Sequence, residues 1–233
     1  MPKAFDSWQV FPHRPLEKLE PNLWHVEGDL PGQNGTRAMT IVKLADGRLI
    51  IHSCIALEEE LMKEIEAFGT PAFLLVPNGF HRLDSKIYKQ RYPQLKVFCP
   101  SAEKKKVAQV VAVDGSYNDA PKDDSVSVFE LEGTKGHEGV IEVHSPSGTS
   151  IIFNDAVNNV PKLGGVFGFM LAPTGRPAVP RIFRWFFVKD KSAFIAHVEK
   201  LAAIADLKRV IVSHGQVMDQ KPADDLKMAL TAF

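Results

Sequence analysis

Residues 71–84 read Pro-Ala-Phe-Leu-Leu-Val-Pro-Asn-Gly-Phe-His-Arg-Leu-Asp and carry the pattern that says most about the fold. The run Ala72–Val76 is continuously apolar, which is typical of a strand that is buried on both faces of a sheet. A loop with a histidine and an acid follows it directly, and functional side chains often lie on such loops above a rigid sheet. This stretch predicts a buried strand that presents polar groups at one sheet edge.

The residues before this strand predict a hairpin and a helix. Thr40–Leu44 and Leu49–Ser53 are β-rich runs separated by Asp46-Gly47, a strong signal for a hairpin turn. Apolar residues then recur at helical spacing across 57–68, and Gly69 ends the helix. A helix that leads into a buried strand is typical of an α/β sheet covered by helices.

The residues after this buried strand continue the alternation of helices and strands. Ser101 and Asp190 are good helix N-caps, and Pro222 suits the first turn of a last helix. We expect a loop at 114–124, and a long loop or flap at Pro161–Pro180, which holds four glycines and four prolines. Further short strands are expected at Lys96–Cys99, Val126–Leu131, Val140–His144, Ser150–Asn154 and Val210–Ser213.

Composition narrows the class of protein. The 233 residues include 28 basic and 28 acidic ones, so no positive excess favours nucleic acid as a partner. No secretory signal opens the chain, and no apolar run approaches the ~20 residues that span a bilayer, so we expect a cytoplasmic protein without a membrane partner. Cys54 and Cys99 stand in apolar runs and are expected to be buried, not bridged or metal-bound.

Three later segments also place ionisable residues after strands, at Gly136-His137, Asn154-Asp155 and His214-Gly215. In this order the chain resembles the metallo-β-lactamase-like superfamily over most of its length. In that family a strand ends in a His-x-His-x-Asp-His loop. A Gly-His, an acid that bridges two metals and a late His-Gly follow, and His137, Asp155 and His214 match these three. Residues 23–28 resemble the opening strands, and 47–101 resemble a branch with a Pro-Asn-x-x-His segment.

The resemblance implies a four-layer αββα sandwich, with two mixed sheets packed face to face and helices outside. It implies one domain over residues 1–233, with halves at about 20–125 and 126–233. His137, Asp155 and His214 would then converge at one edge of the sandwich.

The first ligand loop departs from the family pattern, and two registers are open. If the strand end sets the register, the four ligand positions hold no good transition-metal ligand: Asn78, Phe80, Arg82 and Leu83. Shifted by one residue, which we favour, they are Gly79, His81, Leu83 and Asp84. In both registers the acid that would hold a second metal is lost, so at most one ion is expected.

The resemblance implies a site for that ion made of His81, His137, Asp155 and His214, with Asp84 as a fifth ligand or as a partner that orients a histidine ring. Imidazole nitrogens and a carboxylate suit zinc, although iron and manganese also fit. An open position would let the ion activate water, so Asp155 and Asp84 are the catalytic candidates.

Each of these residues also has a structural alternative. A histidine after a strand often anchors a loop by hydrogen bonds, and an aspartate there often caps a turn, as Asp155 could. His25, His52 and His144 lie in strand-like runs and are expected to be structural. His13 and His197 are expected to be exposed.

Two functions of different classes remain open. We favour a mononuclear metal-dependent hydrolase of a small ester, lactone or thioester bound against the flap. The alternative is a metal-free, non-catalytic member of the same fold that binds a small molecule or a protein; a mononuclear iron redox protein has no further support. The aromatic residues Phe183 and Trp185–Phe187, beside Arg181 and Arg184, are expected to form a pocket wall or a homodimer contact in preference to a membrane-surface patch.

Overall fold

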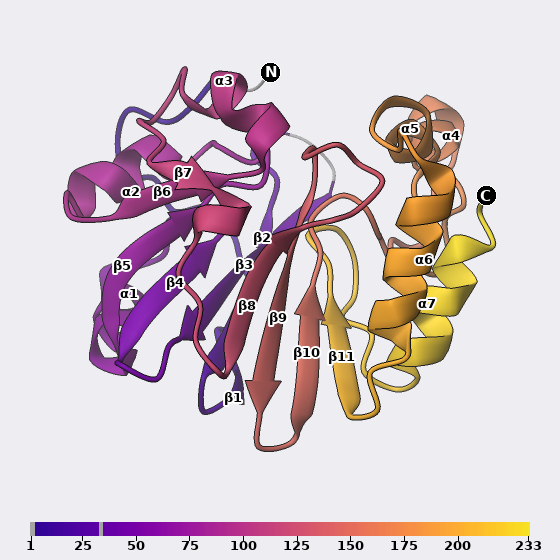
Figure 1. Ribbon diagram of the computed structural model, residues 1–233. Helices are drawn as coiled ribbons and strands as arrows, with labels where there is room; N and C mark the ends of the chain where they lie inside the picture. Colours follow the sequence, from indigo (N-terminus) through magenta and orange to yellow (C-terminus); the bar gives the residue numbers. More distant parts are fainter. Residues whose placement is uncertain (1–2, 33–34) are drawn as a thin grey trace. The chain divides into compact units, whose positions relative to one another are not determined.

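The computed structural model describes residues 3–32 and 35–233, which form two compact units with their boundary between Val128 and Phe129. Each unit has one mixed β-sheet and its own helices (Figure 1). No helix in the described ranges is both long and apolar enough to cross a bilayer.

The first unit is built on a seven-stranded sheet in the order β1-β2-β3-β4-β5-β6-β7. Strands β1 to β4 are antiparallel neighbours, and β4 to β7 pair in parallel. The strands are β1 Glu17–Glu20, β2 Leu23–Asp29, β3 Thr36–Lys43, β4 Arg48–His52, β5 Thr70–Leu75, β6 Lys96–Cys99 and β7 Gly115–Ser116. The helices are α1 Glu59–Phe68, α2 Ser85–Arg91 and α3 Lys104–Val107, with 3₁₀ turns η1 Ser101–Glu103 and η2 Tyr117–Asp119.

The hairpin, helix and buried strand predicted from the sequence are confirmed. Strands β3 and β4 pair antiparallel around Gly47, whose φ of 84° needs the conformational freedom of glycine. Gly69 follows the end of α1, and a Cβ atom there would lie 2.5 Å from the carbonyl oxygen of Gly47. Only glycine permits this close approach, which brings the end of α1 beside the β3–β4 turn and starts β5.

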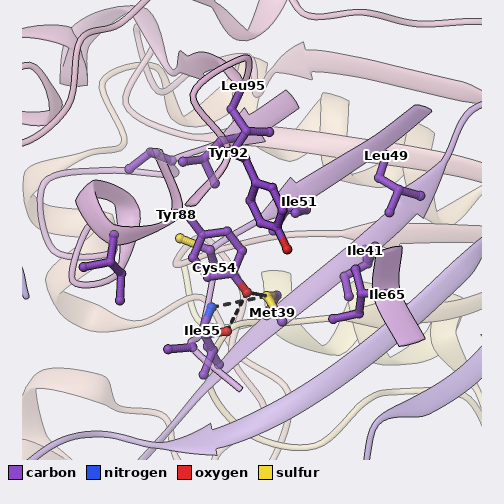
Figure 2. Packing of buried hydrophobic residues seen from close by; sticks show 14 of the residues in the cluster. Met39, Ile41, Leu49, Ile51, Cys54, Ile55, Ile65, Tyr88, Tyr92 and Leu95 are labelled. Carbon is purple, nitrogen blue, oxygen red and sulfur yellow. Dashed lines mark hydrogen bonds between the residues drawn. The ribbon is translucent and has the colours of Figure 1, made fainter. Parts of the chain in front are cut away.

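The core of the first unit packs α1 and α2 against the sheet (Figure 2). The Tyr88 hydroxyl of α2 is fully buried and donates a hydrogen bond to the carbonyl of Ile55 at 2.7 Å. Cys54 lies in the same cluster, where burial raises the pKa of its thiol. Cys54 and Cys99 are both buried thiols, as the sequence predicted. A thiol held neutral in this way packs as a small apolar group.

The second unit has a four-stranded sheet in the order β11-β10-β9-β8. Strands β9 and β10 are antiparallel, and β10 and β11 are parallel. The strands are β8 Val126–Glu130, which crosses the boundary at Val128, β9 Gly139–Ser145, β10 Gly148–Ile152 and β11 Leu207–Ile211. The helices are α4 Gly165–Leu171, α5 Arg181–Phe186, α6 Lys191–Ala202 and α7 Pro222–Leu230. Asp190 caps α6 by accepting the N–H of Ala193 at 3.0 Å, and Pro222 opens α7, both as predicted.

Several short elements differ from the sequence predictions. Ser101 is the first residue of the 3₁₀ turn η1, whose N-cap is Pro100, and the expected loop 114–124 contains β7 and η2. The expected flap Pro161–Pro180 contains α4. Helix α4 was not predicted because its glycines disfavour a helix and because its apolar residues show no amphipathic period. Helices α2 and α5 were missed because seven and six residues are too few to show a period.

Candidate functional site

The second unit brings two of the predicted ligands together. Strands β10 and β11 are parallel neighbours whose last residues, Ile152 and Ile211, lie opposite each other. Asp155 and His214 each follow three residues after these ends, so their loops leave the same sheet edge. Oδ1 of Asp155 lies 3.3 Å from Nε2 of His214, and each side chain keeps 28% of its surface exposed. A carboxylate oxygen and an imidazole nitrogen are therefore side by side and open to solvent.

The position of His214 depends on the glycine that follows it. Gly215 has a φ of 101°, and a Cβ atom there would lie 2.2 Å from the carbonyl oxygen of Asn159. The carbonyl of His214 accepts the N–H of Asn159 at 3.2 Å. The His-Gly pair thus has a local physical reason, because a side chain at 215 would push this backbone contact apart.

A buried hydrogen bond connects the two strand-end loops. The hydroxyl of Ser213 donates to Oδ1 of Asn154 at 2.6 Å, and both side chains are buried. These residues immediately precede His214 and Asp155. The bond therefore fixes the spacing of the two loops next to the pair that they carry.

Glu138 organises the loop that carries Asp155, a role that was not predicted from the sequence. Its Oε1 accepts the backbone N–H groups of Asn154 at 2.8 Å, Asp155 at 3.1 Å and Ala156 at 3.4 Å. Burial, helped by the nearby charge of Asp155, raises the pKa of Glu138 well above the ordinary value, although the N–H groups oppose this shift. The only available signal was an acid directly after His137 in a turn with two glycines.

His137 does not join Asp155 and His214. Lys135 and Gly136 have positive φ values of 50° and 76°, and the chain turns sharply before the histidine. The ring of His137 then packs edge-on against Phe187, with centroids 5.4 Å apart. Among the described residues, no metal-capable group of side chains includes it. The predicted convergence therefore holds for two of the three second-unit residues.

In the first unit, the loop after β5 is held by its asparagine. Oδ1 of Asn78 accepts the N–H of Phe80 at 2.8 Å and of His81 at 3.2 Å, and the Asn78 side chain is buried. The ring of His81 stays half-exposed, with Nδ1 3.3 Å from the hydroxyl of Ser53. Asn78 thus shapes a turn, which leaves His81 as the accessible imidazole of this loop.

The other polar residues of the loop serve the first unit's interior. Asp84 is buried against Arg37 in a salt bridge, and its Oδ1 accepts the N–H of Ala56 at 3.1 Å. Burial raises the pKa of Asp84, while Arg37 opposes the shift. Arg82 is buried and donates to the carbonyl of Lys106 and, at 3.0 Å, to Oε1 of Gln109. These contacts give Asp84 a structural role and lend no support to a catalytic one.

The remaining histidines divide between core and surface. His25 and His52 are buried in β2 and β4, as expected, whereas His144 in β9 is exposed. His13 and His197 were expected to be exposed but are half-buried. Nε2 of His13 lies 2.6 Å from Glu58, and Nδ1 of His197 accepts the N–H of Glu132 at 3.0 Å.

Comparison with known proteins identifies the fold. No protein-family model and no curated protein sequence matches the chain. Solved structures do match. The DIM-1 metallo-β-lactamase has a TM-score of 0.65 at 15% identity, covering 96% of this chain and 98% of that one. VMB-1 has a TM-score of 0.62 at 14% identity, covering 96% and 97%.

A third match is TMB-1, with a TM-score of 0.64 at 12% identity, covering 95% of this chain and 98% of that one. These similarities extend over nearly the whole chain, and the two mixed sheets with their helices agree with the fold class that the sequence predicted. At such low identity the match concerns architecture alone. The chain has the metallo-β-lactamase-like α/β sandwich fold.

Proposed function

We propose that the protein binds one divalent metal ion, with Asp155 and His214 as ligands, and hydrolyses a small ester, lactone or thioester. The observation that carries the proposal is the 3.3 Å approach of the Asp155 carboxylate to the His214 imidazole at a solvent-accessible sheet edge. Imidazole nitrogen and carboxylate oxygen are a donor set that suits zinc, and iron or manganese as well. The sequence resemblance adds His81 as a further ligand.

Hydrogen bonds within the second unit preorganise the two proposed ligands. Glu138 fixes the backbone of Asp155, and the Ser213–Asn154 bond fixes the spacing of the loops. Ligand atoms that are held in advance bind an ion without the cost of ordering a loop. A bound ion would supply Lewis acidity and lower the pKa of a water molecule.

The proposal is limited to one ion, because in both registers of the 78–84 loop the acid that the resemblance requires for a second ion is lost. The acid position holds Arg82 in one register and Leu83 in the other. The same observation favours a second candidate function. In that case Asp155 and His214 form only an ion pair, and the protein binds a small molecule or a protein partner without metal.

Elemental analysis of protein purified without added metal, followed by calorimetric titration with zinc, separates the two functions. The proposal expects about one ion per chain, and zinc-dependent hydrolysis within a panel of p-nitrophenyl esters, lactones and thioesters. Asp155→Asn and His214→Ala should lose both properties, whereas His144→Ala should keep both. His81→Ala tests the ligand that rests on the resemblance alone.

Failure to bind zinc at neutral pH would reject the metal site and leave the metal-free alternative. Stoichiometric zinc without hydrolysis of any panel member would keep the metal site and reject the hydrolase. Metal loss in His214→Ala but not in His81→Ala would restrict the protein ligands to the second unit.

A further inference from the structure

Helices α4 and α5 of the second unit expose an unusual amount of apolar surface. Within the described residues, six of the nine exposed large hydrophobic side chains lie on these two short helices, which we call the aromatic patch: Val166, Phe167, Phe169, Met170, Trp185 and Phe186. Val166 is 78% exposed and Trp185 is 61% exposed. Helices α4 and α5 lie side by side in the second unit (Figure 1). Phe169 and Trp185 meet edge to face with centroids 6.3 Å apart, which joins the side chains of the two helices in one surface.

All the charged residues in the segment that carries the patch are basic. Between Ala156 and Lys189 it contains five basic residues and no acidic one, although the whole chain has no net charge. The five are Lys162, Arg176, Arg181, Arg184 and Lys189, and none of them forms an ion pair with a described residue. The segment that carries the apolar surface therefore has five cations that no described carboxylate pairs with.

The arginine nearest the patch is built into it. The guanidinium of Arg181 lies 4.0 Å from the ring centroid of Phe169 and 5.8 Å from that of Trp185. It also donates to the carbonyl of Phe169 at 2.9 Å. Lys162 and Lys189 are exposed. Arg181 thus lies on the same surface as two aromatic rings of the patch, and two exposed lysines belong to the same segment of the chain. This combination suits a partner with an apolar layer beneath a negatively charged surface.

We propose that the aromatic patch docks on the surface of a bilayer that contains anionic lipids. Exposed Trp and Phe next to Lys and Arg match the interfacial region of such a membrane, where rings enter the headgroup boundary and cations meet lipid phosphates. No described helix can span the bilayer, so the contact is peripheral. This proposal replaces our expectation from the sequence of a pocket wall or a homodimer contact.

The charge argues against a second copy of the chain as the occupant. A twofold dimer would place the same patch on both sides of the interface. Arg181 and its basic neighbours would then face one another without any acidic residue from the same segment to compensate them. A bilayer with anionic headgroups supplies the missing negative charge.

Cosedimentation of the whole protein with vesicles tests the proposal. We expect binding to phosphatidylcholine vesicles with roughly 30% phosphatidylserine, and much weaker binding to phosphatidylcholine alone or at high salt. Lys162→Gln combined with Lys189→Gln should weaken binding about 25-fold, or about fivefold for each charge removed. Phe167→Ser combined with Trp185→Ser should weaken it at least about tenfold.

Lys200→Gln combined with Lys208→Gln is the matched control, because it removes the same charge from exposed positions in α6 and β11. Circular dichroism and the melting temperature confirm that each variant is folded. Equal binding to neutral and anionic vesicles, equal losses in the control and patch variants, or no vesicle binding would each overturn the proposal. If the protein does not bind vesicles but forms a dimer, and Phe167→Ser combined with Trp185→Ser dissociates that dimer, the occupant of the patch is a second copy of the chain.

Discussion

Oε1 of Glu138 lies 3.1 Å from the backbone nitrogen of Asp155 and accepts its hydrogen bond. Glu138 is fully buried, and the same oxygen accepts two further N–H groups of the loop that follows β10. The exposed carboxylate of the candidate site is therefore positioned by a second carboxyl group that solvent does not reach. This arrangement connects the stability of the loop to the position of the Asp155 carboxylate.

Glu138→Ala should destabilise the protein by about 3 kcal/mol or more, because it leaves three backbone donors buried without an acceptor. Glu138→Gln should cost less than about 1 kcal/mol, since its amide oxygen can accept the same bonds and the raised pKa favours a neutral group here. Urea unfolding at neutral pH measures both changes. Equal losses in the two variants would show that the acceptor oxygen is not what stabilises the loop.

The buried pair of Arg37 and Asp84 should behave as a structural unit. Asp84→Asn should destabilise the protein by about 3–5 kcal/mol, because the Arg37 charge is left buried without compensation. Arg37→Met combined with Asp84→Asn should recover a large part of that loss. Urea unfolding measures the free energy of unfolding of the wild type and of the single and double variants. The zinc content per folded chain should be the same in all of them. A fall in zinc content without loss of stability would instead place Asp84 in the site, as the resemblance implied.

His25 should make the protein less stable in mild acid. Burial lowers the pKa of His25 from 6.5 to about 4, so the unfolded chain takes up a proton that the folded chain refuses. The stability contributed by this neutral ring is fully present above the unfolded pKa. It is lost as the pH falls through the window between the two pKa values, by up to about 3 kcal/mol.

Urea unfolding of the wild type and of His25→Gln between about pH 7.5 and about pH 4 measures this effect, because the variant lacks the titrating ring. The exposed His144→Gln serves as the control and should keep the wild-type dependence. An unchanged pH dependence in His25→Gln would mean that other groups cause the acid sensitivity.

Metal binding should distinguish His214 from His137. His214→Ala should lower zinc affinity at least about 100-fold, since even partners outside the ligand set are worth about 10–100-fold. His137→Ala should leave affinity within about twofold, because its ring packs on Phe187 and not beside Asp155. Zinc affinity should also fall as the pH is lowered, because a protonated imidazole cannot ligate. Calorimetry provides both measurements, and a large loss in His137→Ala would restore the ligand set that the resemblance implied.

The local elements could be predicted from the sequence because short-range physics determines them. The β3–β4 turn depends on Asp46-Gly47, the end of α1 on Gly69, and the start of α6 on the Asp190 cap. The order of segments around His137, Asp155 and His214 then pointed to the fold. Helix α4 escaped prediction because an apolar, glycine-rich helix of seven residues has neither propensity nor period to reveal it.

Only the tertiary structure decided which of the site candidates meet. Asp155 and His214 come together because β10 and β11, more than fifty residues apart, pair in parallel and end at the same level. Asp84 is buried against Arg37, and the ring of His137 packs against Phe187. A residue type and its place after a strand are local properties, whereas the direction of its side chain depends on partners that are distant in the sequence. Burial of an ionisable group depends on the same distant partners, which is why the role of Glu138 became evident only in the fold.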